Sequence, residues 1–197
     1  MRNAPARKSS SNRPMALGTV ADLARTKDSH EAPQRTNIHR MNDADALDLL
    51  RAAVPAADGE VWADLGAGTG VFTRALAALV GPAGRVIAVD RDARALESLR
   101  RSTGGGSAAA IDVLVGDVTR ALALPTLDGV VMANVLHFVA EAEGVLSRVA
   151  ALLKPGGRLV LIEYEGRRPS RWVPHPVDFA RFVELAAGAG FTLNPAM

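Results

Sequence analysis

The chain of 197 residues contains no cysteine and is poor in aromatic residues, which make up 4% of it. The absence of cysteine excludes disulfide scaffolds, thiolate zinc sites and cysteine nucleophiles, and it fits a reducing compartment. An apolar run of the roughly 18 to 20 residues that a membrane-spanning helix needs is also missing. Apolar residues (48%) and charged residues (22%) are ordinary for a globular protein, which excludes a collagen-like or wholly disordered chain. We therefore expect a soluble, cytoplasmic protein with one hydrophobic core.

Charge is unevenly distributed along the chain. Residues 1–40 carry eight Arg or Lys and three Asp or Glu, a net charge of +5, whereas residues 41–197 carry fifteen and eighteen, a net charge of −3. The first segment has too little apolar area to offset its chain entropy. We predict that residues 1–40 form a basic, largely disordered extension and that order begins near Met41. The extension could touch nucleic acid, act as an organelle transit peptide or have no function of its own.

From residue 42 onward, short apolar runs alternate with amphipathic stretches. Asn42 is a good N-cap for the first helix, with Asp45 three residues later. Continuous apolar strands between helices indicate a parallel sheet that is covered on both faces. The predicted strands are 61–65, 85–89, 111–115, 129–133, 158–163 and one that begins at 191. The predicted helices are 42–54, 71–79, 92–101, 141–153 and 178–187, with a turn at 154–157.

Parallel sheets of this kind bind ligands at the carboxyl ends of their strands. The first predicted strand leads directly into Asp64-Leu65-Gly66-Ala67-Gly68-Thr69-Gly70, and a helix follows at once. Glycines at alternate positions allow a tight turn and bring backbone amides close to a ligand, and the helix N-terminus adds partial positive charge. The dinucleotide fingerprint G-x-G-x-x-G would need glycine where Val71 stands. This departure disfavours a nicotinamide oxidoreductase.

An acidic residue ends the second predicted strand. Asp90 lies twenty residues after Gly70, where a carboxylate can accept hydrogen bonds from both ribose hydroxyls of a bound nucleoside. A helix cap is the alternative role for Asp90, because Asp92 and a helix follow it. The combination of a strand-end acid with a glycine loop favours the ribose role.

Five motifs in order resemble the class I S-adenosylmethionine-dependent methyltransferases over residues 60–191: ADLGAGTGVFTRAL, GRVIAVDRD, VLVGDVT, VVMANVLHFV and LKPGGRLVLIEYE. The resemblance implies an α/β fold, a three-layer Rossmann-like sandwich with a mostly parallel sheet of seven strands. It also implies an enzyme that moves a methyl group from S-adenosyl-L-methionine to an acceptor by in-line displacement. Correct positioning supplies most of the rate gain in such a step. Residues 41–197 would then form the methyltransferase domain.

The resemblance also assigns cofactor-binding roles. It gives the methionine end of the cofactor to Asp64, Gly66, Ala67, Gly68 and Gly70, and the ribose to Asp90 with Arg91 beside the adenosine. Asp117, followed by Val118, would accept the hydrogen bond of the adenine amino group, and Asn134 would contact the cofactor. Asp117 could instead be a solvated turn acid, and Asp112 is the weaker candidate for the adenine site. No metal site is predicted.

The acceptor side is less well defined by the motifs. His137 is the one plausible general base, because an imidazole titrates near neutral pH, but beside Phe138 it could simply be packed or shape the substrate site. Tyr164, Trp172 and His175 follow the fifth strand of the family pattern and are the acceptor-facing candidates. Trp172 could equally pack under the last helix.

The chain ends inside or just after the sixth strand of the family pattern. The antiparallel seventh strand, which the family inserts beside the fifth, is therefore either lost, beyond the end of a fragment, or replaced by another segment. We expect a methyltransferase, a monomer or homodimer, that acts on an O, N or C atom of a small molecule. The alternative is a non-catalytic cofactor-binding or scaffolding protein. The acidic body with few aromatics disfavours a nucleic-acid substrate, and no membrane partner is expected.

Overall fold

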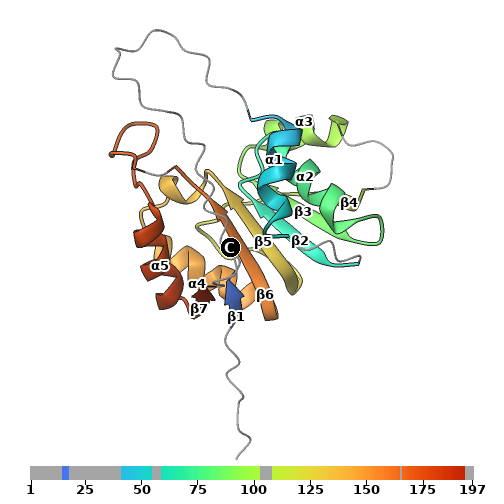
Figure 1. Cartoon of the computed structure of the whole chain (residues 1–197). Coiled ribbons are helices and arrows are strands. Elements are labelled where there is room, and N and C mark those ends of the chain that lie inside the picture. Colours follow the sequence, from blue (N-terminus) through green and yellow to red (C-terminus); the bar gives the residue numbers. More distant parts are fainter. Residues whose placement is uncertain (1–14, 18–40, 55–58, 103–107, 165, 194–197) are drawn as a thin grey trace, which may run out of the picture.

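The computed structural model describes residues 15–17, 41–54, 59–102, 108–164 and 166–193 of the chain. At its centre is a five-stranded sheet (Figure 1). Its strands are β2 (Val61–Leu65), β3 (Arg85–Asp90), β4 (Ala110–Val115), β5 (Leu127–Ala133) and β6 (Leu153–Ile162). The spatial order is β4-β3-β2-β5-β6, and every pair is parallel. The order reverses between β2 and β5, so a crevice is expected at the carboxyl ends of these two strands.

Helices cover both faces of the sheet, as the continuous apolar strands predicted. The helices α1 (Asp43–Arg51), α2 (Val71–Val80) and α3 (Ala93–Ser102) lie on one face. The helices α4 (Ala142–Leu152) and α5 (Phe179–Gly188) lie on the other (Figure 1). Alternate strand residues point into the two layers: Trp62 and Val86 pack with α1 and α2, whereas Ala63 and Ile87 pack on the side of α4 and α5. The predicted three-layer α/β sandwich is confirmed.

Most elements begin and end within two residues of their predicted positions. The N-cap of α1 forms a capping box, in which the Asn42 side chain accepts from the Asp45 amide and the Asp45 carboxylate accepts from the Asn42 amide. The predicted turn at 154–157 is wrong, because β6 runs through it with an irregularity in its pairing to β5. Lys154 anchors this stretch through two hydrogen bonds of 2.8 Å to the carboxylate of Asp128. A partner 26 residues away therefore outweighs the local turn signal.

The edge beyond β6 differs from the expected arrangement. The strand β1 (Met15–Leu17) pairs in parallel with β7 (Phe191–Leu193) and lies beside β6 (Figure 1). The prediction that order begins near Met41 is thus wrong for residues 15–17, which gain backbone partners at the sheet edge that composition does not reveal. The rest of the predicted extension, residues 1–14 and 18–40, lies outside the described residues. The family pattern places its seventh strand at the edge where β1 lies.

None of the helices that the structure describes is long and apolar enough to cross a membrane.

Packing at the centre of the sheet gives the first prediction. Gly129 in β5 faces the fully buried ring of Trp62 in β2, and a Cβ atom at this position would overlap that ring. We expect Gly129→Ala to lower the free energy of unfolding by about 1–3 kcal/mol, the usual cost of overpacking a core. Urea denaturation of the two proteins measures the change. The matched control is Gly188→Ala in α5, where a Cβ meets no atom within 4 Å. An equal loss in both variants would contradict the packing argument.

Candidate active site at the carboxyl ends of the strands

The glycine loop between β2 and α2 has a conformation that its sequence requires. Gly66, Gly68 and Gly70 have φ angles of 86°, 53° and 86°, in the left-handed region where side chains are disfavoured. A Cβ at Gly66 would overlap Val135, and one at Gly70 would overlap Leu99, so these two glycines permit close packing. A Cβ at Gly68 would meet no atom within 4 Å. Gly68 is therefore where the turn presents its backbone to open space.

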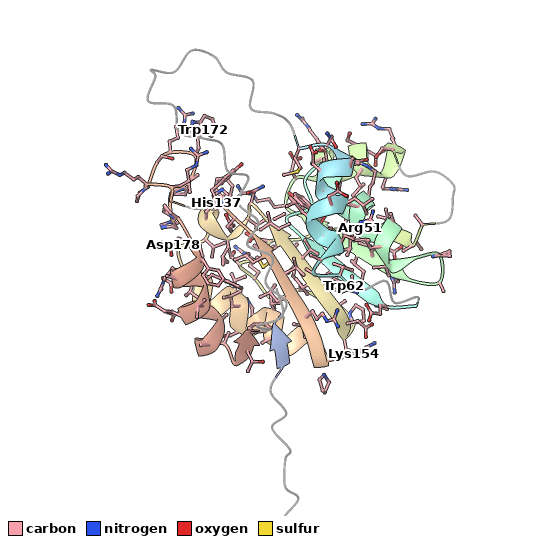
Figure 2. All side chains as sticks on the ribbon, in the orientation of Figure 1. Arg51, Trp62, His137, Lys154, Trp172 and Asp178 are labelled. Carbon is pink, nitrogen blue, oxygen red and sulfur yellow. The ribbon has the colours of Figure 1, made fainter. Side chains whose placement is uncertain are left out.

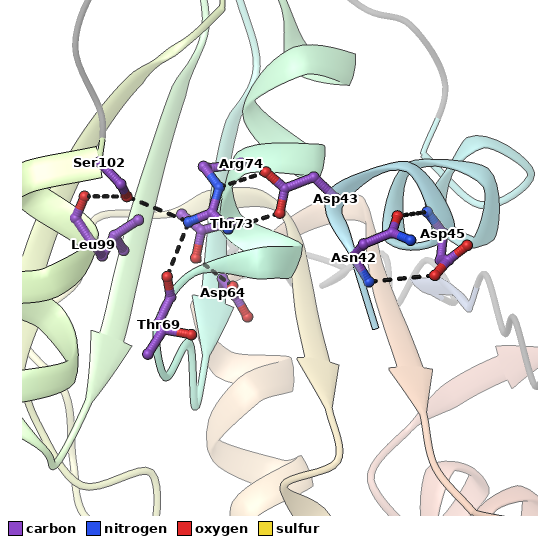
Figure 3. Close-up of polar contacts among 9 residues, drawn as sticks. All are labelled: Asn42, Asp43, Asp45, Asp64, Thr69, Thr73, Arg74, Leu99 and Ser102. Atoms are coloured by element: carbon purple, nitrogen blue, oxygen red, sulfur yellow. Dashed lines mark hydrogen bonds and ion pairs between the residues drawn. The ribbon is translucent and has the colours of Figure 1, made fainter. Parts of the chain in front are cut away.

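Hydrogen bonds hold the loop in place from two sides, and those made by Arg74 are drawn in Figure 3. The Asp90 carboxylate at the end of β3 accepts from the Gly68 amide at 2.8 Å. On the other side, Arg74 donates to the Thr69 carbonyl at 3.0 Å and makes two bonds of 2.7 Å with Asp43 at the start of α1. Because a bidentate arginine–carboxylate pair has a fixed geometry, α1 is tied to the loop through Arg74.

A cavity of about 260 Å³ opens beside this loop, at the crevice between β2 and β5. Six of the predicted cofactor-binding residues line it: Gly66, Asp90, Arg91, Asp117, Val118 and Asn134. Gly116, Thr119, Val135, Phe138 and Val139 complete the lining. Four other predicted residues, Asp64, Ala67, Gly68 and Gly70, are not among the lining residues of this cavity. The residues that follow four different strands thus meet at one site.

Two carboxylates of the cavity are oriented by short backbone bonds. Asp90 accepts from the amides of Gly68 and Asp92, both at 2.8 Å, and each oxygen keeps a lone pair for a ligand. Asp117 accepts from the hydroxyl and the amide of Thr119 at 2.7 and 2.8 Å, and these bonds lower its pKa. Asp117 therefore remains a fixed anion and hydrogen-bond acceptor at neutral pH.

Asn134 enters the cavity through an unusual backbone conformation. Its φ angle of 56° is left-handed, and it is the only such non-glycine residue among those that the structure describes. Asparagine tolerates this conformation better than most residues, and the Asn134 amide donates to the Ile162 carbonyl at 2.8 Å. This turn ends β5 and places Val135, Phe138 and Val139 along the cavity.

Asp64, at the end of β2, is buried and makes one side-chain hydrogen bond. Its carboxylate accepts from the Thr73 hydroxyl at 2.6 Å, and the residue is 1% exposed. Burial raises the pKa of Asp64 to about 6, the nearby charge of Asp90 adds to the rise, and the Thr73 bond opposes it. The proton of Asp64 is thus held more tightly in the folded chain than in the unfolded chain.

His137 forms a buried pair with Glu163, a residue that the sequence reasoning did not select. His137 lies in the short 3-10 helix η1 (Leu136–Phe138), and its Nδ1 is 2.6 Å from Glu163 Oε2. The other Glu163 oxygen accepts from the amides of Leu136 and His137 at 2.7 and 3.3 Å. Because Glu163 directly follows β6, one carboxylate connects the ends of two neighbouring strands. The acidic residue at the strand end was the signal that could have identified it.

The structure brings two of the three acceptor-facing candidates to His137 and leaves the third outside. The Tyr164 ring lies 5.8 Å from the His137 ring, and the His175 amide donates to the His137 carbonyl at 2.9 Å. Trp172 is 72% exposed and lies away from the core (Figure 2). His137 itself is 2% exposed and lies outside the lining of the main cavity. Thr119 and Phe138, which do line it, were not selected from the sequence, because their roles depend on loop conformation.

Comparison with known proteins supports the same reading. Residues 63–161 match the family model described as a methyltransferase domain. A demethylmenaquinone methyltransferase of Symbiobacterium thermophilum is 36% identical over 109 residues, 53% of this chain and 43% of that protein. A ubiquinone/menaquinone biosynthesis C-methyltransferase of Hydrogenovibrio crunogenus is 32% identical over 130 residues, 64% of this chain and 49% of that protein. The chain therefore spans less than half the length of these two relatives.

A solved structure agrees with this result. A methyltransferase from a complex with a methyltransferase activator of Haloferax volcanii is 26% identical, with a TM-score of 0.59 over 74% of this chain and 65% of that one. The chain belongs to the methyltransferase domain family, and its fold is that of the class I S-adenosylmethionine-dependent methyltransferases. The predicted family is thereby confirmed.

The raised pKa of Asp64 predicts how stability depends on pH. Since the folded chain holds this proton up to about pH 6 and the ordinary value is 3.8, the free energy of unfolding falls as the pH rises between these values. The full loss amounts to roughly 3 kcal/mol, of which about 2 kcal/mol falls between pH 4.5 and pH 7.5. Asp64→Asn keeps an oxygen that can accept from Thr73, and its side chain does not titrate. Its free energy of unfolding should therefore lack this part of the pH-dependent loss. Urea denaturation at pH 4.5 and 7.5 measures the difference, and parallel losses in the two proteins would contradict it.

Proposed function

We propose that this protein transfers the methyl group of S-adenosylmethionine to a small aromatic acceptor, at a ring carbon activated by a neighbouring hydroxyl group. The buried His137–Glu163 pair beside the cofactor cavity carries this proposal. Carbon as the acceptor atom, rather than oxygen or nitrogen, is supported by relatives named for quinone methylation.

The residues of the cavity fit the proposed cofactor. Asp90 offers carboxylate oxygens to two adjacent hydroxyl groups, and Asp117 offers one to an exocyclic amino group. Val118, Val135 and Phe138 provide apolar surface for a flat heterocycle between them. Gly68 leaves open space at the loop, where the methionine end would lie. When bound, the cofactor would supply a methyl group attached to a positively charged sulfur. Loss of the methyl group converts this sulfonium into a neutral thioether, which is the leaving group.

The chain's own residues then have to orient the acceptor and remove one proton. We place the acceptor between η1 and the segment after β6, against Phe138 and Tyr164, which are 54% and 42% exposed. Because Glu163 Oε2 takes the Nδ1–H hydrogen bond, the imidazole presents Nε2 as a proton acceptor. His137 takes the proton of the acceptor hydroxyl, which increases electron density at the adjacent ring carbon. After the methyl group joins that carbon, the ring proton moves to the oxygen, so one proton leaves in total.

Loss of Asp90 should weaken cofactor binding. Removing two charge-assisted hydrogen bonds, each of about 1.5–3 kcal/mol, predicts a decrease in affinity of at least roughly 100-fold for Asp90→Ala. Calorimetric titration with S-adenosylhomocysteine measures it, with NAD as the negative ligand. The matched control is Asp48→Ala, which removes the same charge from an exposed position on α1. If Asp90→Ala binds as tightly as the parent, or if Asp48→Ala is the weaker variant, the ribose assignment is wrong.

Loss of the base should reduce turnover more than binding. We expect His137→Gln to lower kcat by about 10²–10⁴-fold, the usual range for general base catalysis, and Glu163→Gln to lower it less. Asp48→Ala, which changes an exposed side chain on α1, is the control.

The assay uses methyl-labelled S-adenosylmethionine with reduced naphthoquinols, phenols and amines, and mass spectrometry and NMR locate the new methyl group. Methylation at oxygen or nitrogen would overturn carbon as the acceptor atom. Cofactor binding without transfer to any of the panel would favour the non-catalytic alternative. Unchanged kcat in His137→Gln would reduce His137 to a packing role.

A further inference from the structure

Exposed apolar side chains are concentrated at one end of the molecule. The described part of the chain has five large apolar residues that are strongly exposed, and four of them follow the carboxyl ends of β5 and β6: Phe138, Tyr164, Trp172 and Phe179. Trp172 is the most exposed, at 72%. It belongs to residues 166–177, which we call the Trp172 loop. The loop connects β6 to α5 next to the proposed acceptor site, where the amide of His175 in the loop donates to the His137 carbonyl.

The exposure of Trp172 is imposed by the structure of the loop. Ser170 and Val173 exchange backbone hydrogen bonds of 3.0 and 3.2 Å, which places Arg171 and Trp172 at the tip of a tight turn. The Ser170 hydroxyl accepts from the amides of Trp172 and Val173 at 3.3 and 3.1 Å. Val173 is buried, and the His175 amide bonds to the His137 carbonyl. The base of the loop is thus anchored to the core while its tip projects into solvent.

The same loop is strongly basic. Arg167, Arg168 and Arg171 are exposed, and residues 166–177 contain no Asp or Glu. Among the described residues, none of the three arginines forms an ion pair. Instead, the Arg171 guanidinium lies 5.0 Å from the Trp172 ring and the Arg167 guanidinium 5.3 Å from the Tyr164 ring. These cation–π contacts hold positive charge next to exposed aromatic rings.

We propose that the Trp172 loop docks on the surface of an anionic phospholipid bilayer. Tryptophan and tyrosine favour the boundary between water and the hydrocarbon region, because their rings are apolar and their edges polar. Arginine side chains bind lipid phosphate groups and are attracted by the negative surface potential of anionic membranes. The loop tip has tryptophan at its apex and three arginines around it. It therefore matches both the boundary region and the phosphate groups of such a bilayer. An acidic protein would match the arginines but would leave the exposed rings without an apolar partner.

The docked orientation would place the proposed acceptor site at the membrane surface. Tyr164 contributes both to that site and to the loop through its contact with Arg167, so an apolar acceptor dissolved in the bilayer could reach His137 without crossing bulk water. Membrane docking itself does not depend on the proposed chemistry, and the test below measures it without turnover.

Tryptophan fluorescence of the full chain provides a direct test. The chain has two tryptophans, and Trp62 is fully buried with its Nε1 bonded to Glu60. A change in emission therefore reports Trp172. With vesicles of phosphatidylcholine and phosphatidylglycerol we expect a blue shift of the emission and quenching by brominated acyl chains, and with pure phosphatidylcholine we expect much weaker effects. Since one arginine near an anionic surface contributes roughly a factor of five, replacing Arg167, Arg168 and Arg171 with Gln should weaken binding about 100-fold.

A matched variant separates the loop from general electrostatic attraction. Replacing Arg51, Arg94 and Arg101 with Gln removes the same charge from exposed positions on α1 and α3, and it should leave the emission shift within about twofold of the parent. Binding of S-adenosylhomocysteine and the melting temperature confirm that both triple variants are folded. Vesicle sedimentation without any change in Trp172 emission would overturn the proposal, because the contact would then lie elsewhere on the chain. A stronger shift with polyglutamate than with anionic vesicles would also overturn it, in favour of an acidic protein partner.

Discussion

The carboxylate of Glu163 determines the shape of the site more than any other single group. It accepts hydrogen bonds from two amides of η1 and from the His137 ring, and thereby connects the end of β6 to the end of β5. The backbone of His137 in turn holds His175 at the base of the Trp172 loop. Because buried polar groups are costly without partners, this arrangement is effectively fixed once β5 and β6 pair. The proposed cofactor cavity, the proposed base and the proposed membrane-docking loop all depend on it.

Three aspartates at neighbouring strand ends have different environments and therefore different properties. Asp64 is buried, and its pKa is raised to about 6. Asp117 is partly exposed and its pKa is lowered by bonds from Thr119, while Asp90 is fixed by the amides of Gly68 and Asp92. The same residue type thus provides a structural group beneath the glycine loop and two oriented acceptors in the cavity. A ligand with several hydroxyl and amino groups matches the acceptors that face the cavity.

Features that depend on residues close to one another in the sequence were predictable from the sequence. The capping box at Asn42 follows from local hydrogen bonding, and the glycine loop follows from the φ angles that only glycine adopts easily. Asp90 could be placed because parallel strands end at one edge of the sheet. Features formed between distant segments were missed. The irregularity of β6 depends on Lys154 meeting Asp128, and β1 is a strand because it lies against β7.

By itself, then, the sequence determined the α/β order of elements, the family and six residues that line the cavity, because periodicity and motif spacing are properties of the chain alone. Only the tertiary structure decided which strand-end residues meet. It paired His137 with Glu163, buried Asp64 against Thr73 and placed Trp172 at the exposed tip of an anchored turn. The physical reason is that burial and partnership depend on distances between segments that are separated by many residues, and these distances exist only after the sheet has formed.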